Sequence, residues 1–481
     1  MQQVKGKKII SELPNYSTSI ILMSFTSLLG QLDLRYINKL FINSKAKGIS
    51  GNKVFQALFT YRFLDFSNIF QLMQVGISKE LGFEKDVLYA FMKNSRINWR
   101  KIVHLFFRQV TCLIDAHTDG SSKMAHRYFI VDDTQLDKSG KTIELIGKVF
   151  DHCTHQYTLG MKMLVLGIWE GKTFLPIDFS FHNEPTKTNK RGMKEKELRL
   201  QFSKQRNTTD ASYARIEEVE ANKIENALKM IRQALKKNIL ADYVLADSWF
   251  ICENFIKDIL SMNGSKLHVI GLMKTNRKIT LHEKEIMANK IPEVKQKDIR
   301  TSTKLKCRYI TFNILYKGIP MKAYWVCMKG QHSWKMLIST DTKLTFIDAM
   351  KHYQVRWSIE VFFKDCKQKL HLNACQSTDL DAHIATVSIV FMNYMILAMR
   401  KRFDDYETLG GLFTDIKEII IEDILIKKIW NIFIDAYMLI FSPMGVEWEI
   451  FITNLIQNKD EINELILQNF DIFFKLNKNV A

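Results

Sequence analysis

Polar residues that could do chemistry recur along one predicted helix, residues 351–367. An α-helix turns about 100° per residue, and on that wheel one face carries Tyr353, Arg356, Glu360, Lys364 and Lys367. The far side is apolar and would anchor the helix to a core; it carries Val355, Ile359, Phe362, Cys366 and Leu370. Arginine can grip a phosphate through two parallel hydrogen bonds. The simpler interpretation is an exposed helix supported by ion pairs such as Glu360 with Lys364.

Two aspartate positions follow short apolar runs that predict buried strands. The first run, residues 127–134, ends in Asp132 and Asp133, and the second, residues 243–250, carries Asp247 ahead of a predicted helix. Acids at strand ends lie where a site forms in an α/β sheet. The simpler alternatives are an Asp-rich turn after the first strand and a helix-capping aspartate after the second.

The order Y-x-x-R-x-x-x-E, six residues and then K is carried by Tyr353, Arg356, Glu360 and Lys367. This order resembles the signature of a large family of insertion-sequence transposases, which are cut-and-paste DDE enzymes with a ribonuclease-H-like core. The resemblance extends by motif over roughly residues 125–375. It implies that the catalytic carboxylates are Asp133, Asp247 and Glu360, because the family's first aspartate ends a strand and precedes threonine. Adjacent strand residues face opposite ways, so Asp132 is the close competitor.

The same resemblance implies the chemistry. Two Mg²⁺ ions, with Mn²⁺ as a substitute, would be held by Asp133, Asp247 and Glu360, and such pairs activate a nucleophile and stabilise a leaving oxygen. DNA contacts would come from Tyr353, Arg356, Lys364 and Lys367. The expected activity is cutting an insertion sequence at its terminal inverted repeats and joining the 3′ ends to target DNA, performed by a homodimer in a synaptic complex.

The predicted fold is α/β, a ribonuclease-H-like core flanked by helical regions. By resemblance, residues 1–120 bind the terminal repeats, residues 121–375 form the catalytic domain, and residues 376–481 support dimerisation. Glu360 follows Asp247 at a separation of 113 residues, which predicts a β-rich insertion at about 278–335. Trp325 or Trp334 there could stack on an unpaired base, although core or surface packing is the commoner role of a tryptophan.

Several helices and strands are expected from hydrophobic periodicity. Helical segments are predicted at 20–34, 54–64, 102–113, 216–237, 384–402, 412–433 and 448–476, and strands at 161–168, 174–181, 267–273 and 336–341. Basic residues in 85–101, among them Lys93, Arg96, Arg100 and Lys101, could present a face to DNA or be an ordinary solvated helix. The basic stretch 184–210 could follow a phosphate backbone or be a solvated loop.

Charge and composition favour a nucleic-acid partner in a reducing compartment. The chain of 481 residues has a net charge of +18, which favours a polyanion. Residues 1–120 hold sixteen basic and eight acidic side chains, whereas residues 376–481 hold nine and sixteen. Seven cysteines without paired spacing indicate free thiols and a cytoplasmic setting. Residues 13–32 are too polar to span a membrane, and residues 382–399 suit a buried core helix better, so no membrane partner is expected.

Two alternatives to an active transposase remain open. A ribonuclease-H-like nuclease would cut DNA and never join it to a target. A catalytically retired transposase would act as a DNA-binding protein, although all three carboxylates are present.

Overall fold

The computed structural model describes residues 29–30, 32–44, 47–74, 81–117, 126–151, 154–184, 190–403, 408–409, 411–417, 429–430, 432–434, 437–441, 443–445 and 447–466. Two compact units are formed. The first is drawn from residues 1–32, 47–88 and 406–481, and the second from residues 33–46 and 89–405. The domain boundaries expected from the sequence stay a prediction.

The first unit is helical where it is described. Its elements are α4 (Gly51–Thr60), the 3₁₀ turn η1 (Tyr61–Leu64), α5 (Ile69–Gln74), the π-helical turn η7 (Tyr437–Phe441) and α18 (Trp448–Gln457). The predicted helix at 54–64 is confirmed as α4 followed by η1, whose Phe63 contacts Phe413. The predicted helices at 20–34 and 412–433 lie largely outside the described residues. Helix α7 (Lys85–Met92) belongs partly to each unit.

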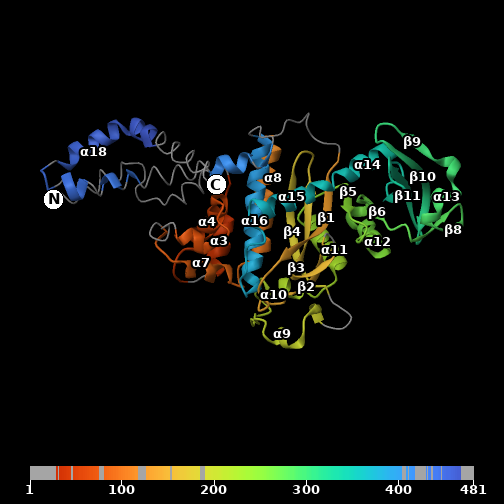
Figure 1. Cartoon of the computed structure of the whole chain (residues 1–481), viewed down its shortest axis with the longest axis horizontal. Helices are drawn as coiled ribbons and strands as arrows, with labels where there is room; N and C mark the ends of the chain where they lie inside the picture. Colours follow the sequence, from red (N-terminus) through yellow and green to blue (C-terminus); the bar gives the residue numbers. More distant parts are fainter. Residues whose placement is uncertain are drawn as a thin grey trace. The chain divides into compact units, whose positions relative to one another are not determined.

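The second unit is built on a mixed sheet of twelve strands, which confirms the α/β class (Figure 1). The strands are β1 (Tyr128–Asp137), β2 (Gly147–Asp151), β3 (Gln156–Trp169), β4 (Phe174–His182), β5 (Tyr243–Ala246), β6 (His268–Met273), β7 (Lys278–Leu281), β8 (Lys284–Met287), β9 (Arg300–Ser302), β10 (Cys307–Tyr316), β11 (Ile319–Met328) and β12 (Lys335–Ser339). Their order is β2-β3-β1-β5-β6-β12-β11-β10-β7-β8, with β4 on β3 and β9 on β10. Parallel pairing joins β1, β5 and β6, and the other pairs are antiparallel.

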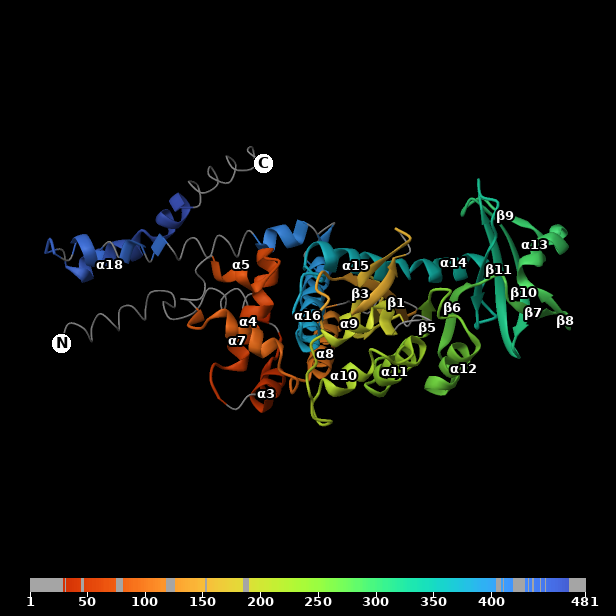
Figure 2. The ribbon, with the colours of Figure 1, turned by 60° about the horizontal axis from the view of Figure 1, so that its bottom comes forward.

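Helices cover the central strands. The helices of this unit are α3 (Arg35–Ser44), α8 (Trp99–Ala116), α9 (Glu195–Arg199), α10 (Tyr213–Glu217), α11 (Lys223–Lys236), α12 (Glu253–Ser261), α13 (Ile291–Val294), α14 (Phe346–Gln354), α15 (Trp357–Gln368) and α16 (Leu380–Phe403). Helices α8 and α16 pack on each other and on β4, α11 packs on β3 and β4, and α15 packs on β1 and β4 (Figures 1 and 2). The sheet therefore has helices on both faces around β1.

Helix α16 is the apolar segment that the sequence predicts as a core helix. It is long and apolar enough to cross a membrane, but its most apolar stretch is entirely buried inside the protein. Its side chains include Phe391 and Tyr394, whose rings contact Phe362 of α15. Burial on all sides explains why the helix is hydrophobic all round.

The predicted β-rich insertion extends the same sheet. Strands β7 to β11 leave the core after β6, and β12 returns to pair with β6. Trp325 is fully buried and its Nε1 donates to the carbonyl of Ala288, so it belongs to the core of the insertion. Trp334 is half-buried, with the Arg308 guanidinium 5.6 Å from its ring centre. Trp325 is therefore not placed to stack on a base.

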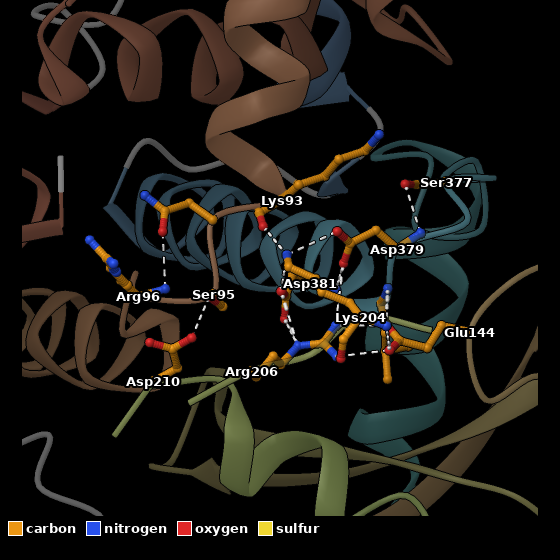
Figure 3. A network of polar contacts seen from close by, with 12 residues as sticks. Lys93, Ser95, Arg96, Glu144, Lys204, Arg206, Asp210, Ser377, Asp379 and Asp381 are labelled. Carbon is orange, nitrogen blue, oxygen red and sulfur yellow. Dashed lines mark hydrogen bonds and ion pairs between the residues drawn. The ribbon is translucent and has the colours of Figure 1, made fainter. Parts of the chain in front are cut away.

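A buried ion network fixes the segment around residue 205 to the start of α16 (Figure 3). Arg206 makes two hydrogen bonds to Glu144, of 2.8 and 2.7 Å, and also pairs with Asp381 and Asp379. Lys204 donates to Asp379 at 3.0 Å and to Asp381 at 2.7 Å. The Arg206 side chain is 3% exposed. The predicted role of the 184–210 stretch in following a phosphate backbone is therefore wrong for these two cations, which bind protein carboxylates.

A second buried network accounts for one of the basic residues predicted to face DNA. Arg100, at the start of α8, pairs with Asp178 of β4 at 2.8 Å and with Glu218 at 2.8 Å. Arg215 of α10 pairs with Asp178 at 3.0 Å and stacks on Phe179. Arg100 thus ties α8 to the sheet, which corrects its predicted place on a DNA-facing surface.

Candidate active site

Asp132 lies on strand β1, and Asp247 directly follows the neighbouring parallel strand β5. In the pairing of β1 with β5, Val131 lies opposite Ala246, the last residue of β5, and an aspartate comes next in each segment. Residues opposite each other in parallel strands point to the same face, whereas consecutive residues alternate. Asp132 and Asp247 therefore share one face of the sheet, and Asp133 points to the other.

The sequence predicts a strand that ends at Asp132 and Asp133, but β1 continues past both. It continues to Asp137 because β3 pairs with it along its whole length, with Asp132 opposite Val165 and Asp133 opposite Leu164. The strands predicted at 161–168 and 174–181 are confirmed as β3 and β4, which pair antiparallel. The acids therefore lie in the middle of a paired strand, where the backbone holds their direction firmly.

The predicted continuous helix at 351–367 is two helices. Helix α14 ends at Gln354 and α15 begins at Trp357, with Val355 and Arg356 between them. Hydrogen bonds of the tighter i to i−3 kind run through this turn, from Arg356 N to Tyr353 O and from Ile359 N to Arg356 O. The predicted apolar stripe is buried at Ile359, Phe362, Cys366 and Leu370, and Val355 is half-buried.

Aromatic contacts position α14 over the strands. The Tyr128 hydroxyl and His352 Nδ1 are 2.5 Å apart, and the Tyr243 ring lies 5.0 Å from the His352 ring. The Tyr243 hydroxyl donates to Asp341 Oδ2 at 3.0 Å. Tyr128 and Asp132 lie four residues apart on the same face of β1, so a helix fixed at His352 brings Arg356 to Asp132.

Arg356 bridges two of the carboxylates. Its Nη1 lies 2.7 Å from Asp132 Oδ2 and its Nη2 lies 2.5 Å from Glu360 Oε1. Burial raises the pKa of Asp132, the positive charge of Arg356 opposes the rise, and the negative charges of Asp133 and Asp247 add to it; together they bring the pKa to about 7. The guanidinium thus stands between carboxylates that would otherwise repel one another.

Tyr353 completes this group. Among the described residues its buried hydroxyl has no hydrogen-bond partner, and burial raises its pKa to about 12. The Arg356 guanidinium lies 5.7 Å from its ring centre. The structure thus brings together Asp132, Asp247, Tyr353, Arg356 and Glu360, with Lys364 exposed and Lys367 half-buried farther along α15. A protonated hydroxyl and an arginine beside carboxylates can contact a phosphate.

Asp133 lies on the opposite face of β1, away from Glu360. Its Oδ2 is 2.5 Å from Nζ of Lys223, the first residue of α11. The same ammonium lies 4.6 Å from the ring centre of Trp249, whose side chain is 47% exposed. The structure therefore does not join Asp133 to the other two carboxylates chosen from the sequence. Trp249, two residues after Asp247, could have been noticed there, but nothing in the sequence signals Lys223.

The candidate metal ligands are of the type found in magnesium sites, but their side chains are not gathered into a metal-binding cluster. Asp132, Asp247 and Glu360 offer only carboxylate oxygens, which Mg²⁺ prefers. Across the described part of the chain, no three His, Cys, Asp or Glu side chains are grouped closely enough to hold an ion. Arg356 supplies the positive charge between Asp132 and Glu360 in this arrangement. The residues fit a divalent ion once Arg356 releases a carboxylate.

Comparison with known proteins agrees with this chemistry at a coarse level. Residues 74–297 match the model of a family described as DDE superfamily endonuclease. The matched range contains Asp132, Asp133 and Asp247 and ends before Glu360. No curated protein matches the chain. The match supports a DDE-type transposase or nuclease that acts on DNA, in a superfamily whose members generally use divalent metals.

Proposed function

We propose that the protein is a transposase that cuts an insertion sequence at its terminal inverted repeats and joins the 3′ ends to target DNA. The observation that carries the proposal is that Arg356 joins Glu360 to Asp132, and that Asp132 shares a face of the sheet with Asp247. The DDE superfamily match over residues 74–297 supports DNA as the substrate. The parallel strands β1, β5 and β6 beside antiparallel β2 and β3 are consistent with a ribonuclease-H-like core.

We assign the first catalytic position to Asp132 in place of Asp133. Asp132 shares a face with Asp247 and contacts the arginine that binds Glu360, whereas Asp133 is paired with Lys223. Asp132, Asp247 and Glu360 would hold two Mg²⁺ or Mn²⁺ ions. When bound, such ions supply an activated water or hydroxyl and stabilise the leaving oxygen.

The remaining residues of the site would bind and orient the DNA. Arg356 would carry its charge to a phosphate, to which a guanidinium can make two parallel bonds. Tyr353 would donate its free hydroxyl to a phosphate oxygen. Lys364 and Lys367 would extend the positive charge along α15. Residues 1–120 would bind the terminal repeats, and residues 376–481 would pair two copies in a synaptic complex.

A nuclease that does not join DNA is the second candidate, because the matching family is described by endonuclease activity alone. The two candidates differ in one product. A transposase gives molecules in which the element's 3′ end is joined to target DNA, and a nuclease gives only cut ends.

The test uses DNA flanking the gene, incubated with the purified protein and Mg²⁺ or Mn²⁺, beside the Glu360→Gln protein. We expect metal-dependent cuts at a pair of inverted repeats, followed by joined products, and we expect the variant to bind this DNA without cutting it. Cutting by Glu360→Gln at the wild-type rate would refute the site. Binding by the wild-type protein with no cutting in either metal would indicate a retired enzyme.

A further inference from the structure

One segment of the β-rich insertion contains no acidic residue. Residues 299–340 hold eight Lys or Arg and no Asp or Glu. They form β9, β10, β11 and β12. A chain of net charge +18 thus places a large share of its excess in 42 consecutive residues, a concentration that points to a polyanionic partner.

Six of these cations gather at one end of the four strands. Pairing places Cys307 opposite Met328 and opposite Ser302, and Val326 opposite Lys335, while Lys329 N donates to Lys306 O at 2.9 Å. The start of β10, the end of β11, the start of β12 and β9 therefore lie together. We call this cluster the basic rim; its members are Arg300, Lys304, Lys306, Arg308, Lys329 and Lys335. All six are exposed, and among the described contacts none forms an ion pair with an acid.

The basic rim lies at the same end of the sheet as the carboxylates. Strand β12 runs antiparallel to β6 with Met336 opposite Met273, so Lys335 lies beside the carboxyl end of β6. Strands β1, β5 and β6 are parallel, and Asp132 and Asp247 lie toward that same end. In Figure 1, β9 and α14 both lie toward the upper part of the view. Neighbouring strands are about 4.8 Å apart, so β12 and β10, two and four strands from β5, lie about 10 and 19 Å along the sheet.

Helix α14 connects the basic rim to the candidate active site. Phe346, its first residue, stacks on Tyr309 of β10 with ring centres 3.9 Å apart. The Tyr324 hydroxyl and Lys322 Nζ both donate to Leu344 O at 2.8 Å, just before the helix. From Phe346 the helix runs to Tyr353 in the candidate active site, a rise of about 1.5 Å per residue. The basic rim therefore keeps a set distance from the carboxylates.

We propose that the basic rim binds the sugar-phosphate backbone of duplex DNA beside the bond that is cut, independently of base sequence. This inference rests on the proposed function, because it takes the carboxylates to face a phosphodiester. A distance of about 10 to 19 Å corresponds to about three to six base pairs at 3.4 Å each. Exposed lysines and arginines without acidic partners bind phosphates and release counterions, and they read no bases.

The experiment compares two charge-matched double variants of the full chain. Lys306→Gln with Lys329→Gln removes two rim charges. Lys284→Gln with Lys317→Gln removes two exposed charges near the opposite end of β10, where Leu315 pairs with Thr280. Each pair contains one lysine with positive φ, Lys306 at 48° and Lys317 at 50°. Any backbone effect of the substitution is thereby matched.

Affinity for a duplex of arbitrary sequence is measured without divalent metal between about 50 and 200 mM salt. We expect the rim variant to lower the slope of log K against log salt by about 2, and the control to leave it unchanged. Equal effects of the two variants would overturn the inference, because net charge alone would then explain them. Rim-dependent binding to anionic lipid vesicles with no rim effect on DNA would also overturn it.

Cleavage by the wild-type protein separates this inference from the proposed function. If the wild-type protein cuts inverted repeats and the rim variant binds and cuts DNA equally well, the rim inference fails and the proposed function stands. If duplex binding depends on the rim and nothing is cut in either metal, the rim inference stands and the catalytic proposal fails.

Discussion

The adjacent aspartates Asp132 and Asp133 give the sharpest test of the candidate active site. Asp132→Asn removes a carboxylate that faces Asp247 and Arg356, whereas Asp133→Asn removes the partner of Lys223. Charge stabilisation in the transition state is worth about 4 kcal/mol for one well-placed group, and that is about a thousandfold in rate. We therefore expect Asp132→Asn to cut inverted-repeat DNA about a thousandfold more slowly, and Asp133→Asn to stay within about tenfold of wild type.

Stability is expected to change in the opposite sense. Burial raises the pKa of Asp132 from 3.8 to about 7, so the folded protein disfavours this charge. An acid with a raised pKa stabilises the fold at low pH, and that contribution is lost as pH rises from about 4 to 7. Above pH 7, Asp132→Asn should therefore be at least as stable as wild type. Asp133→Asn loses a partly exposed ion pair and should cost about 1 kcal/mol.

Cleavage rate and the free energy of unfolding in urea are measured on both variants at the same pH. The two measurements together exclude a folding defect as the cause of slow cutting. The reasoning is refuted if Asp133→Asn stops cutting while Asp132→Asn cuts normally, because the register of β1 against β5 would then not define the catalytic face.

Two predictions concern the frame around the candidate active site. Arg206→Met leaves three buried acids, Glu144, Asp379 and Asp381, with too little positive charge, and it should lower the free energy of unfolding in urea by about 3–5 kcal/mol. The control Arg199→Met breaks an exposed ion pair and should change that free energy by less than about 0.5 kcal/mol. Equal effects of the two substitutions would contradict this account of the network. Burial, aided by the charge of Lys223, lowers the pKa of His182 from 6.5 to about 4. As pH falls, His182 therefore binds a proton in the unfolded chain before it does so in the folded protein. The free energy of unfolding should fall by about 3 kcal/mol as pH drops from 6.5 to 4. His182→Gln should flatten that part of the curve of unfolding free energy against pH, and an unchanged curve would show that another group causes it.

The local pattern of apolar residues was sufficient to predict the helices and strands that flank the carboxylates. The strand before Asp247, the hairpin of β3 and β4, and the buried helix α16 all follow from runs of apolar residues and their period. These features depend on neighbours in the sequence, and burial on both sides leaves a clear signal. The acids Asp247 and Glu360 were chosen from that pattern together with the family resemblance, and both lie in the candidate active site.

The choice between Asp132 and Asp133 could not be made in the same way. Consecutive strand residues face opposite sides, and which side holds the site depends on how β1 is aligned with β5, more than a hundred residues away. The break between α14 and α15 likewise reflects where α14 is held, by His352 on Tyr128. The burial of Arg100 depends on Asp178 and Glu218. Each of these features is set by contacts between distant segments.

The topology also explains how a long insertion can separate Asp247 from Glu360 without disturbing their meeting. The insertion leaves the sheet at the end of β6 and returns through β12, which pairs with β6 itself, Met336 opposite Met273 and Ser339 opposite Ile270. Its two ends are therefore adjacent, and the strands between them extend the sheet outward beyond β12. The chain re-enters the core beside β6 and then forms α14, which carries Tyr353 to the strands that hold Asp132 and Asp247. An insertion placed between any two strands that are not neighbours would have to move one of them, whereas this one adds a basic surface at the catalytic end and leaves the carboxylates where the parallel strands put them.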